Sequence, residues 1–292
     1  MSLARSHSSI PTDTGWPDGS IAGVAALVRE RAGRDLVALD RTFIQRCLER
    51  RCLATGLVGP EEYQDRLATD PAELALLVAS LDVHHTEFFR DPLLHALLEE
   101  RVLPGLALRK DTEGGSEIRI WSAGCAAGQE AYSVAATLLE IADAWRRPIR
   151  FRIFATDASE EQVALARAGR YTDASVRNVR LRQLRRWFKP DGASWVVGDG
   201  LRSAVDFSVH DLLDTASSSP PASIYGGFDL VLCCNVLYYY RPDVQLRILE
   251  RLQACLRPDG FLATGDAERD VVLSSSVFQS AALPSSLFVR WR

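Results

Sequence analysis

The stretch Glu117-Ile-Arg-Ile-Trp-Ser-Ala-Gly-Cys-Ala-Ala-Gly-Gln-Glu-Ala-Tyr-Ser133 predicts a buried strand, a glycine turn and the start of a helix. The run from Ile118 to Trp121 is typical of a buried strand, and apolar residues then recur at helical spacing. Gly124 and Gly128 let the backbone turn tightly and leave its N–H groups open to a ligand, while the following helix adds the positive end of its dipole. The stretch therefore predicts a nucleotide-type cradle, although a bare G-x-x-x-G fits a plain strand-to-helix turn equally well.

The totals of the chain describe a globular protein with room for two domains. Its 292 residues, 47% of them hydrophobic, can supply one large core and one smaller core. The formal net charge of -4 and the isoelectric point near 5.8 argue against a general nucleic-acid-binding protein. Binding to an acidic partner would therefore require a local patch of basic residues.

Cysteine usage and hydropathy point to a reduced, aqueous compartment. The six cysteines form no C-x-x-C pair and several stand in apolar runs, which predicts core thiols rather than disulfides or a zinc site. No window approaches about 18 uninterrupted apolar residues, and residues 1–20 are too polar for a signal peptide. We therefore expect a cytoplasmic protein without a metal centre and without a membrane-inserted segment.

Turn and capping residues divide the chain into four segments. Residues 1–19 are rich in Ser, Pro, Gly and Thr, which predicts a disordered tail, and residues 20–102 show helical patterns. Residues 103–116 contain one proline and three glycines and predict a linker, and residues 117–292 alternate strands with helices. The helices expected in the first domain are 21–31, 40–55, a short one opened by Pro60, and 71–81 with Asp70 as its N-cap.

Two segments are basic. Residues 21–60 hold seven arginines against four acids, and Arg46 and Arg50 share one face of the expected second helix. Residues 167–189 hold eight basic residues against Asp173 alone. Each segment is either a solvated helix face or a docking surface for an acidic partner, and the few aromatic residues in the second argue against single-stranded nucleic acid.

Polar residues follow the expected strands of the second domain. Asp157 ends a strand that starts near residue 149, and Asp211 and Asn235 follow two further apolar runs. Carboxyl ends of parallel strands meet at one edge of an open sheet, so these side chains and Gly124 are expected to face one crevice. Asp157 can accept ribose hydroxyls or cap the next helix, but its late position and the missing third glycine argue against NAD.

The alternation of strands and helices predicts a doubly wound α/β sheet. Short apolar runs around Gly198, at about residues 190–207, predict a small β hairpin or meander inserted into this domain.

Five ordered motifs resemble the chemotaxis-receptor glutamate O-methyltransferases, the CheR family. They are Thr86-x-Phe88-Phe89-Arg90-Asp91, Trp121-Ser-Ala-Gly124, Gly128-x-Glu130-x-Tyr132-Ser133, Ala155-Thr-Asp157, and Cys234-Asn235-Val236 with Tyr239. The resemblance covers residues 20–292. It implies an α/β fold, namely a Rossmann-like class I methyltransferase sheet with an N-terminal all-helical domain and a small inserted antiparallel β subdomain.

The resemblance also implies a function and a site. The family uses S-adenosylmethionine to esterify glutamate side chains on the cytoplasmic helical bundle of chemoreceptors, and we expect a monomer. Arg90 and Tyr239 match catalytic positions, Glu130 the position that meets the methionine amino group, and Asp157 the ribose position. The full set of implied cofactor contacts is Thr86, Arg90, Ala123, Gly124, Glu130, Asp157, Asp211, Leu212, Asn235 and Val236. Arg46, Arg50 and Arg51 are the implied receptor-docking residues.

Some positions depart from the family pattern. Asp211 stands where Asn is common, Ala131 replaces Pro, Cys234 replaces Arg, and Gly265-Asp-Ala-Glu268 replaces a usual G-H-S-E. These departures leave two alternatives to a receptor methyltransferase. One is a non-catalytic signalling or scaffold protein with the same fold, and the other is a small-molecule methyltransferase, which the basic segments disfavour.

Overall fold

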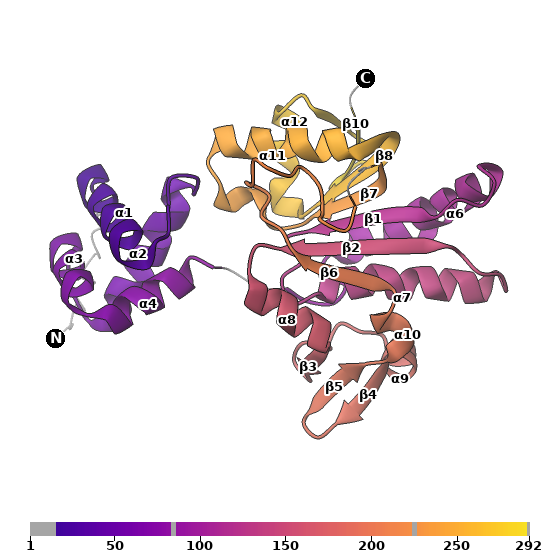
Figure 1. Ribbon diagram of the computed structural model, residues 1–292, viewed down its shortest axis with the longest axis horizontal. Helices are drawn as coiled ribbons and strands as arrows, with labels where there is room; N and C mark the ends of the chain where they lie inside the picture. The colour runs from indigo at the N-terminus through magenta and orange to yellow at the C-terminus, as the bar shows by residue number, and fades with distance from the viewer. Residues whose placement is uncertain (1–15, 83–85, 224–226, 291–292) are drawn as a thin grey trace, which may run out of the picture. The chain divides into compact units, whose positions relative to one another are not determined.

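The computed structural model describes residues 16–82, 86–223 and 227–290, which group into two compact units divided between Val83 and His84. The first unit is a set of helices, and the second is an α/β domain with a small additional sheet (Figure 1). Each unit has its own core, because the buried clusters of the two units share no residue.

The helical unit contains α1 (Asp18–Ala32), α2 (Arg41–Thr55), α3 (Pro60–Thr69) and α4 (Pro71–Ser80). Capping residues bound these helices, as the sequence indicates for Asp70. Asp40 caps α2 by accepting from Phe43 N, and Asp70 caps α4 by accepting from Ala72 N and Glu73 N. Gly56 ends α2 in the left-handed region at φ 74°. The fully buried side chains between the helices include Val24, Val28, Cys47, Tyr63, Leu67 and Leu77.

Residues 16–19, the last four of the expected disordered tail, are ordered. Trp16 is only 4% exposed and its ring lies edge-on to Tyr63, with centroids 5.9 Å apart. Asp18 starts α1 and accepts from Arg41 at 2.6 Å. Residues 16–19 are therefore part of the helical unit. The indole of Trp16 buries a large apolar surface, which holds the adjoining polar residues in place. Residues 1–15 lie outside the described residues.

The domain boundary also differs from the expected linker at residues 103–116. A continuous helical segment runs through α5 (Pro92–Leu97), a π-helical turn η1 (Leu98–Val102) and α6 (Leu103–Thr112). Pro104 therefore stands inside this segment, just after the π-helical turn η1. The buried face of this segment belongs to the core of the α/β unit, through Leu94, Leu98, Leu103 and Leu106.

A seven-stranded sheet forms the centre of the second unit, in the order β6-β2-β1-β7-β8-β10-β9. Strands β1 (Ile118–Ala123), β2 (Phe151–Asp157), β6 (Val205–Val209), β7 (Phe228–Cys233) and β8 (Leu256–Thr264) are parallel. Strands β9 (Phe278–Ser280) and β10 (Leu287–Arg290) close one edge in antiparallel fashion. The predicted doubly wound α/β sheet is confirmed.

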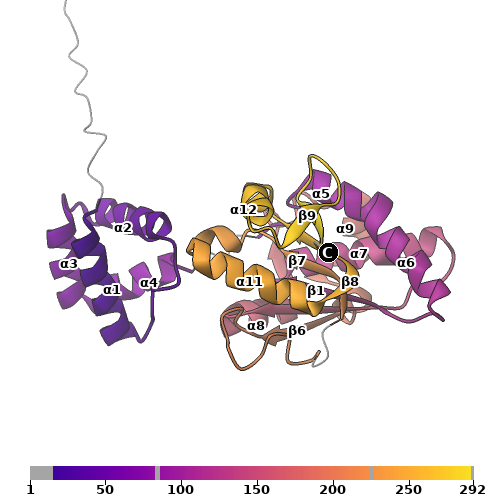
Figure 2. The same ribbon diagram turned by 90° about the horizontal axis from the view of Figure 1, so that it is seen from above.

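Helices cover both faces of this sheet. Helix α7 (Gln129–Ala144) lies on one side of the strands and α11 (Pro242–Cys255) on the other (Figure 2). Helix α7 buries ten residues, mostly small ones, which fits a helix packed directly after a glycine turn. Other helices of this unit are α8 (Glu160–Ala168), α10 (Asp199–Arg202), α12 (Arg269–Ser274) and the 3₁₀ turns η2 (Leu237–Tyr239) and η3 (Asp266–Glu268).

The small inserted sheet has three strands rather than a hairpin at residues 190–207. Its order is β3-β5-β4, formed by β3 (Arg170–Thr172), β5 (Ser194–Val197) and β4 (Phe188–Asp191), with α9 (Leu181–Trp187) before β4. All pairs are antiparallel. The expected range missed β3, whose partner is distant in sequence, and wrongly included β6, which pairs with β2 in the main sheet.

Candidate functional site

Four neighbouring strands end at the same edge of the main sheet. Strands β6, β2, β1 and β7 are adjacent and parallel, so the residues after their carboxyl ends lie together. Gly124 follows β1, Asp157 ends β2, Asp211 follows β6 and Asn235 follows β7. The predicted convergence of these four positions is thus present in the fold.

The loop after β1 is a tight turn held against the neighbouring strand. The N–H groups of Gly124 and Cys125 both donate to Thr156 O, at 2.8 and 2.9 Å. Gly124 has φ 76°, and a Cβ there would lie 2.6 Å from Val236 Cγ2. Glycine is therefore required both by backbone angle and by the close approach of the loop after β7. This contact brings the candidate residues Gly124 and Val236 together.

Asp157 is built into this turn. Its Oδ2 accepts from Ala126 N at 2.8 Å and its Oδ1 accepts from Ser159 N at 2.9 Å, and the residue is 9% exposed. Asp157 does not cap α8, because Ser159 accepts from Gln162 N in that role. Each carboxylate oxygen can accept more than one hydrogen bond, so Asp157 retains capacity for hydroxyl donors.

Glu130 lies in the first turn of α7 and is held from two directions. Ser122 Oγ donates to Glu130 Oε1 at 2.6 Å, and the Cys234 side chain lies near enough to act toward a lower pKa of Glu130. Burial raises the pKa of Glu130, and the hydrogen bonds and the positive charge of Arg90 oppose this rise. A buried carboxylate of this kind favours a cationic ligand group, because a positive charge would restore its ionised form.

Arg90 is held between two anchors in the segment that precedes α5. Phe88 is 1% exposed and packs edge-on against Tyr171, and Asp91 accepts from Leu94 N to cap α5. Phe89 lies in the left-handed region at φ 50° and donates its N–H to Ser133 Oγ on α7. The charge of Arg90, an exposed residue, opposes the rise in the pKa of both Glu130 and Tyr239, so its guanidinium lies within electrostatic range of both groups.

The loop after β7 carries Asn235, Val236 and Tyr239, and a buried carboxylate shapes it. Glu268 is fully buried and accepts from the N–H groups of Asn235, Leu237 and Gly265 at 2.6 to 2.8 Å. Burial raises the pKa of Glu268 to about 7, against the effect of these backbone donors. Sequence reasoning noted Glu268 only as part of an altered motif, because its partners are backbone groups that no side-chain pattern marks.

The remaining cofactor candidates differ in exposure. Leu212 is 8% exposed and its carbonyl accepts from Arg251, whereas Asp211 is exposed and accepts from Leu213 N at 2.8 Å in its own turn. Thr86 is half-buried at the start of the segment that leads to Arg90. Ala123, the last residue of β1, is fully buried and presents no accessible surface to a ligand in this structure.

The three candidate docking arginines of α2 do not share one environment. Arg46 and Arg50 are exposed. Arg51 instead donates to both oxygens of Glu73, at 2.9 and 2.6 Å, and the Tyr63 hydroxyl donates to the same carboxylate at 2.7 Å. Arg51 is therefore engaged inside the helical unit, which its position beside Arg50 in the sequence did not indicate.

The second basic segment, residues 167–189, is largely neutralised by acids from elsewhere in the α/β unit. Its ion pairs are Arg170 with Asp191, Arg177 with Glu87, Arg180 with Glu99, Arg182 with Glu140 and Arg186 with Asp143. Five of the eight basic side chains thus hold the inserted subdomain together or tie it to neighbouring elements.

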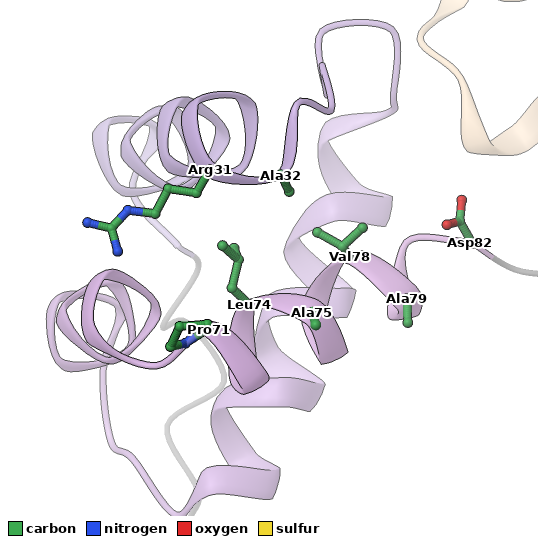
Figure 3. Close-up of a pocket in the computed structure, with 8 residues that line it drawn as sticks. All are labelled: Arg31, Ala32, Pro71, Leu74, Ala75, Val78, Ala79 and Asp82. Atoms are coloured by element: carbon green, nitrogen blue, oxygen red, sulfur yellow. The ribbon is translucent and has the colours of Figure 1, made fainter.

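A groove of about 580 Å³ lies within the helical unit, between the end of α1 and α4 (Figure 3). Its wall is formed by apolar side chains such as Leu74 and Val78, with Arg31 and Asp82 also lining it. It contains no nucleophile or acid–base pair. Among residues 16–82, 86–223 and 227–290, no group of three or more His, Cys, Asp or Glu could hold a metal ion, and no helix is long and apolar enough to cross a membrane.

Comparison with known proteins identifies both units. Residues 84–285 match the family described as CheR methyltransferase, SAM binding domain, and residues 20–81 match CheR methyltransferase, all-alpha domain. The division between the two matches agrees with the division of the structure between Val83 and His84.

Curated relatives give the same result. The chain is 34% identical to chemotaxis protein methyltransferase 1 of Pseudomonas aeruginosa, over 73% of this chain and 76% of that protein. It is 31% identical to the chemotaxis protein methyltransferase of Escherichia coli, over 86% of this chain and 84% of that protein. It is 33% identical to an uncharacterized 104.1 kDa protein of Rhodobacter capsulatus, of which it spans only 23%. The chain belongs to the CheR methyltransferase family, whose α/β domain binds S-adenosylmethionine.

Proposed function

We propose that this chain methylates glutamate side-chain carboxylates on the cytoplasmic helical bundle of a chemoreceptor, with S-adenosylmethionine as methyl donor. The observation that supports it best is the position of Arg90, whose charge reaches both Glu130 in the cofactor crevice and the Tyr239 phenol. A cation and a hydroxyl beside the cofactor site are suited to an anionic substrate.

The crevice fits the polar groups of this cofactor. Glu130 is a buried carboxylate that a cationic amino group would keep ionised. Asp157 has acceptor capacity for the two ribose hydroxyls, and Gly124 lets the turn after β1 pack closely against Val236 of the loop after β7. When bound, S-adenosylmethionine supplies a methyl group activated by a positively charged sulfur.

The residues around the crevice orient the substrate without taking a proton from it. A glutamate carboxylate is already ionised at neutral pH, so the reaction needs no general base. Burial raises the pKa of Tyr239, which keeps the phenol protonated as a hydrogen-bond donor. Arg90 and Tyr239 can hold the carboxylate in line with the methyl group, and such positioning contributes roughly 7 to 11 kcal/mol in favourable cases.

The partner and the setting follow from the same proposal. Arg46 and Arg50 on α2 are exposed and would meet an acidic helical bundle. The enzyme would act as a monomer in the cytoplasm, where the receptor bundle is located. A non-catalytic role of the same fold is less well supported, because Arg90, Glu130 and Tyr239 are all retained around the crevice.

Labelled S-adenosylmethionine and receptor-rich membranes test the proposal. We expect base-labile methyl groups on the receptor, detected as methanol released at high pH, and a strong loss of this signal with Arg90→Ala at unchanged melting temperature. Transfer to small molecules alone would favour a small-molecule methyltransferase, and cofactor binding without any transfer would favour a scaffold protein.

A further inference from the structure

Two neighbouring tyrosines form a hydroxyl pair at the end of the crevice. Tyr238 Oη and Tyr239 Oη are 2.9 Å apart, within hydrogen-bond distance, and the two ring centroids are 4.3 Å apart with an angle of 53° between the rings. Both residues belong to the short turn η2 and both are half-buried. Consecutive side chains rarely meet in a strand or helix, so this contact depends on the turn.

The backbone around this pair is fixed from both sides. Glu268 accepts from Leu237 N at 2.6 Å, at the start of η2. Gln245 Nε2 of α11 donates to Leu237 O at 3.2 Å and to Tyr240 O at 2.9 Å. Because the turn is tied down before and after the pair, the two rings have a defined relative position and their hydroxyl contact is a property of the fold.

The direction of the hydrogen bond matters for the reaction. A phenol has one proton to donate, and only one of the two hydroxyls can donate within the pair. If Tyr239 donated to Tyr238, it would have no proton left for a substrate oxygen. If Tyr238 donates, the Tyr239 proton can point to an anionic carboxylate, and the donated bond polarises the Tyr239 hydroxyl and strengthens it as a donor.

We propose that Tyr238 is a positioning residue that donates its hydroxyl proton to Tyr239 Oη and thereby directs the Tyr239 proton toward the substrate carboxylate. An anionic substrate beside Arg90 selects this direction, because it attracts the Tyr239 proton and not its lone pairs. This inference rests on the proposed carboxylate methylation. It adds a second tyrosine that does not touch the substrate but acts through the first.

A double-mutant cycle tests whether Tyr238 acts through Tyr239. Tyr238→Phe keeps the ring and removes the donor, and we expect kcat to fall about three- to tenfold, the effect of one ordinary hydrogen bond. KM for receptor and affinity for S-adenosylhomocysteine should stay within about twofold. In a Tyr239→Phe background, the same change at Tyr238 should cause no further loss, because its acceptor is gone.

Tyr240→Phe is the matched control, since it removes a hydroxyl from the adjacent tyrosine, and kcat should change less than twofold. Equal losses at Tyr240 and Tyr238, or additive losses at Tyr238 and Tyr239, would show general loosening of the turn and overturn the proposal.

A crystal structure of Tyr238→Phe with S-adenosylhomocysteine gives an answer that does not depend on turnover. The Tyr239 ring should keep its wild-type position, because Glu268 and Gln245 hold the backbone of the turn, so that a loss of kcat traces to the missing donor. A Tyr239 ring that leaves its position would show that Tyr238 acts by packing and would overturn the proposal.

Discussion

Asp157 is a side chain for which we propose two roles, one in the fold and one toward the ligand. Its carboxylate accepts from Ala126 N and Ser159 N, so it holds the glycine turn in place. The sequence predicted its place at the end of β2 but not these two backbone partners. Loss of the carboxylate should therefore affect the cofactor in two ways, through lost hydroxyl contacts and through a looser turn.

We expect Asp157→Ala to weaken S-adenosylmethionine binding by about 1 to 3 kcal/mol, the usual cost of leaving buried polar groups without partners. Isothermal titration calorimetry measures this loss directly. Asp206→Ala is a suitable control, because Asp206 lies on the adjacent strand β6, is exposed and pairs with Arg152. Unchanged affinity in Asp157→Ala would remove this residue from the site.

Glu268 gives the molecule a pH dependence that originates in one buried group. Its pKa is raised from 4.5 to about 7 by burial, so between these values the folded protein binds a proton that the unfolded chain has lost. The stabilisation from Glu268 is fully present below about pH 4.5 and is lost as pH rises toward 7. The part of the unfolding free energy involved is roughly 3 kcal/mol at most.

Glu268→Gln should remove this component. We expect the wild-type melting temperature, corrected for other groups by comparison with the variant, to fall between pH 5 and 7.5, and the variant to show a flatter profile. Parallel profiles for the two proteins would mean that Glu268 stays ionised in the fold throughout this range.

At the scale of elements, capping residues were the most informative signals in the sequence. Asp70 marked the start of α4 correctly, and the expected helix 40–55 differs from α2 only in Asp40, which is its N-cap, because caps act on backbone groups a few residues away. The sequence failed where the partner was distant. Pro104 and Gly105 suggested a linker although they stand in the first turn of α6, and β3 could not be paired with β5 from local pattern.

The surface of helix α2 also shows that the sequence does not reveal partners that are distant along the chain. Arg50 and Arg51 are adjacent in sequence, yet Arg50 is exposed while Arg51 is bound to Glu73, whose side chain is 6% exposed. A test of docking must therefore avoid Arg51. Its reversal to Glu would place two carboxylates together and should destabilise the helical unit by about 3 to 5 kcal/mol, as expected when a buried pair loses one partner.

Arg46→Glu with Arg50→Glu is the appropriate docking variant. We expect a higher KM for receptor, a weaker dependence of that KM on salt, and unchanged affinity for S-adenosylmethionine and unchanged melting temperature, because exposed charges act mainly on association. Receptor methylation kinetics at several salt concentrations provide the measurement. Wild-type kinetics and a wild-type salt response in this variant would show that this face of α2 is solvent-exposed surface that does not dock the receptor.

At the scale of the whole molecule, two separate cores imply two separable units. The core of the α/β unit includes residues from Phe88 to Leu287, whereas that of the helical unit ends at Leu81. The candidate cofactor residues from Thr86 to Val236 all belong to the α/β unit. The sequence placed the boundary near residue 102 because it classed α5 as one more helix of the first domain, without information on which core its apolar face joins.

A fragment of residues 84–292 should therefore fold alone and bind S-adenosylmethionine with an affinity within about threefold of the whole chain, while methylating receptor poorly because it lacks α2. Calorimetry and the methanol-release assay measure the two properties. An insoluble fragment would show that the α/β unit does not fold alone, and a soluble fragment that binds the cofactor much more weakly would show that cofactor binding depends on the helical unit.

The ion pairs of the inserted subdomain weaken the electrostatic attraction that this protein exerts on a diffusing anionic partner. A count along residues 167–189 gives strong positive charge, but the balancing carboxylates of Glu87, Glu99, Glu140 and Asp143 come from other parts of the chain. Each pair is separated by less than the Debye length of about 8 Å at physiological ionic strength, so an approaching anion meets local dipoles that largely cancel at a distance. The long-range electrostatic attraction of this surface for an anion is therefore much smaller than its arginine content indicates. An acidic partner is attracted more strongly by surfaces whose arginines have no such nearby acids.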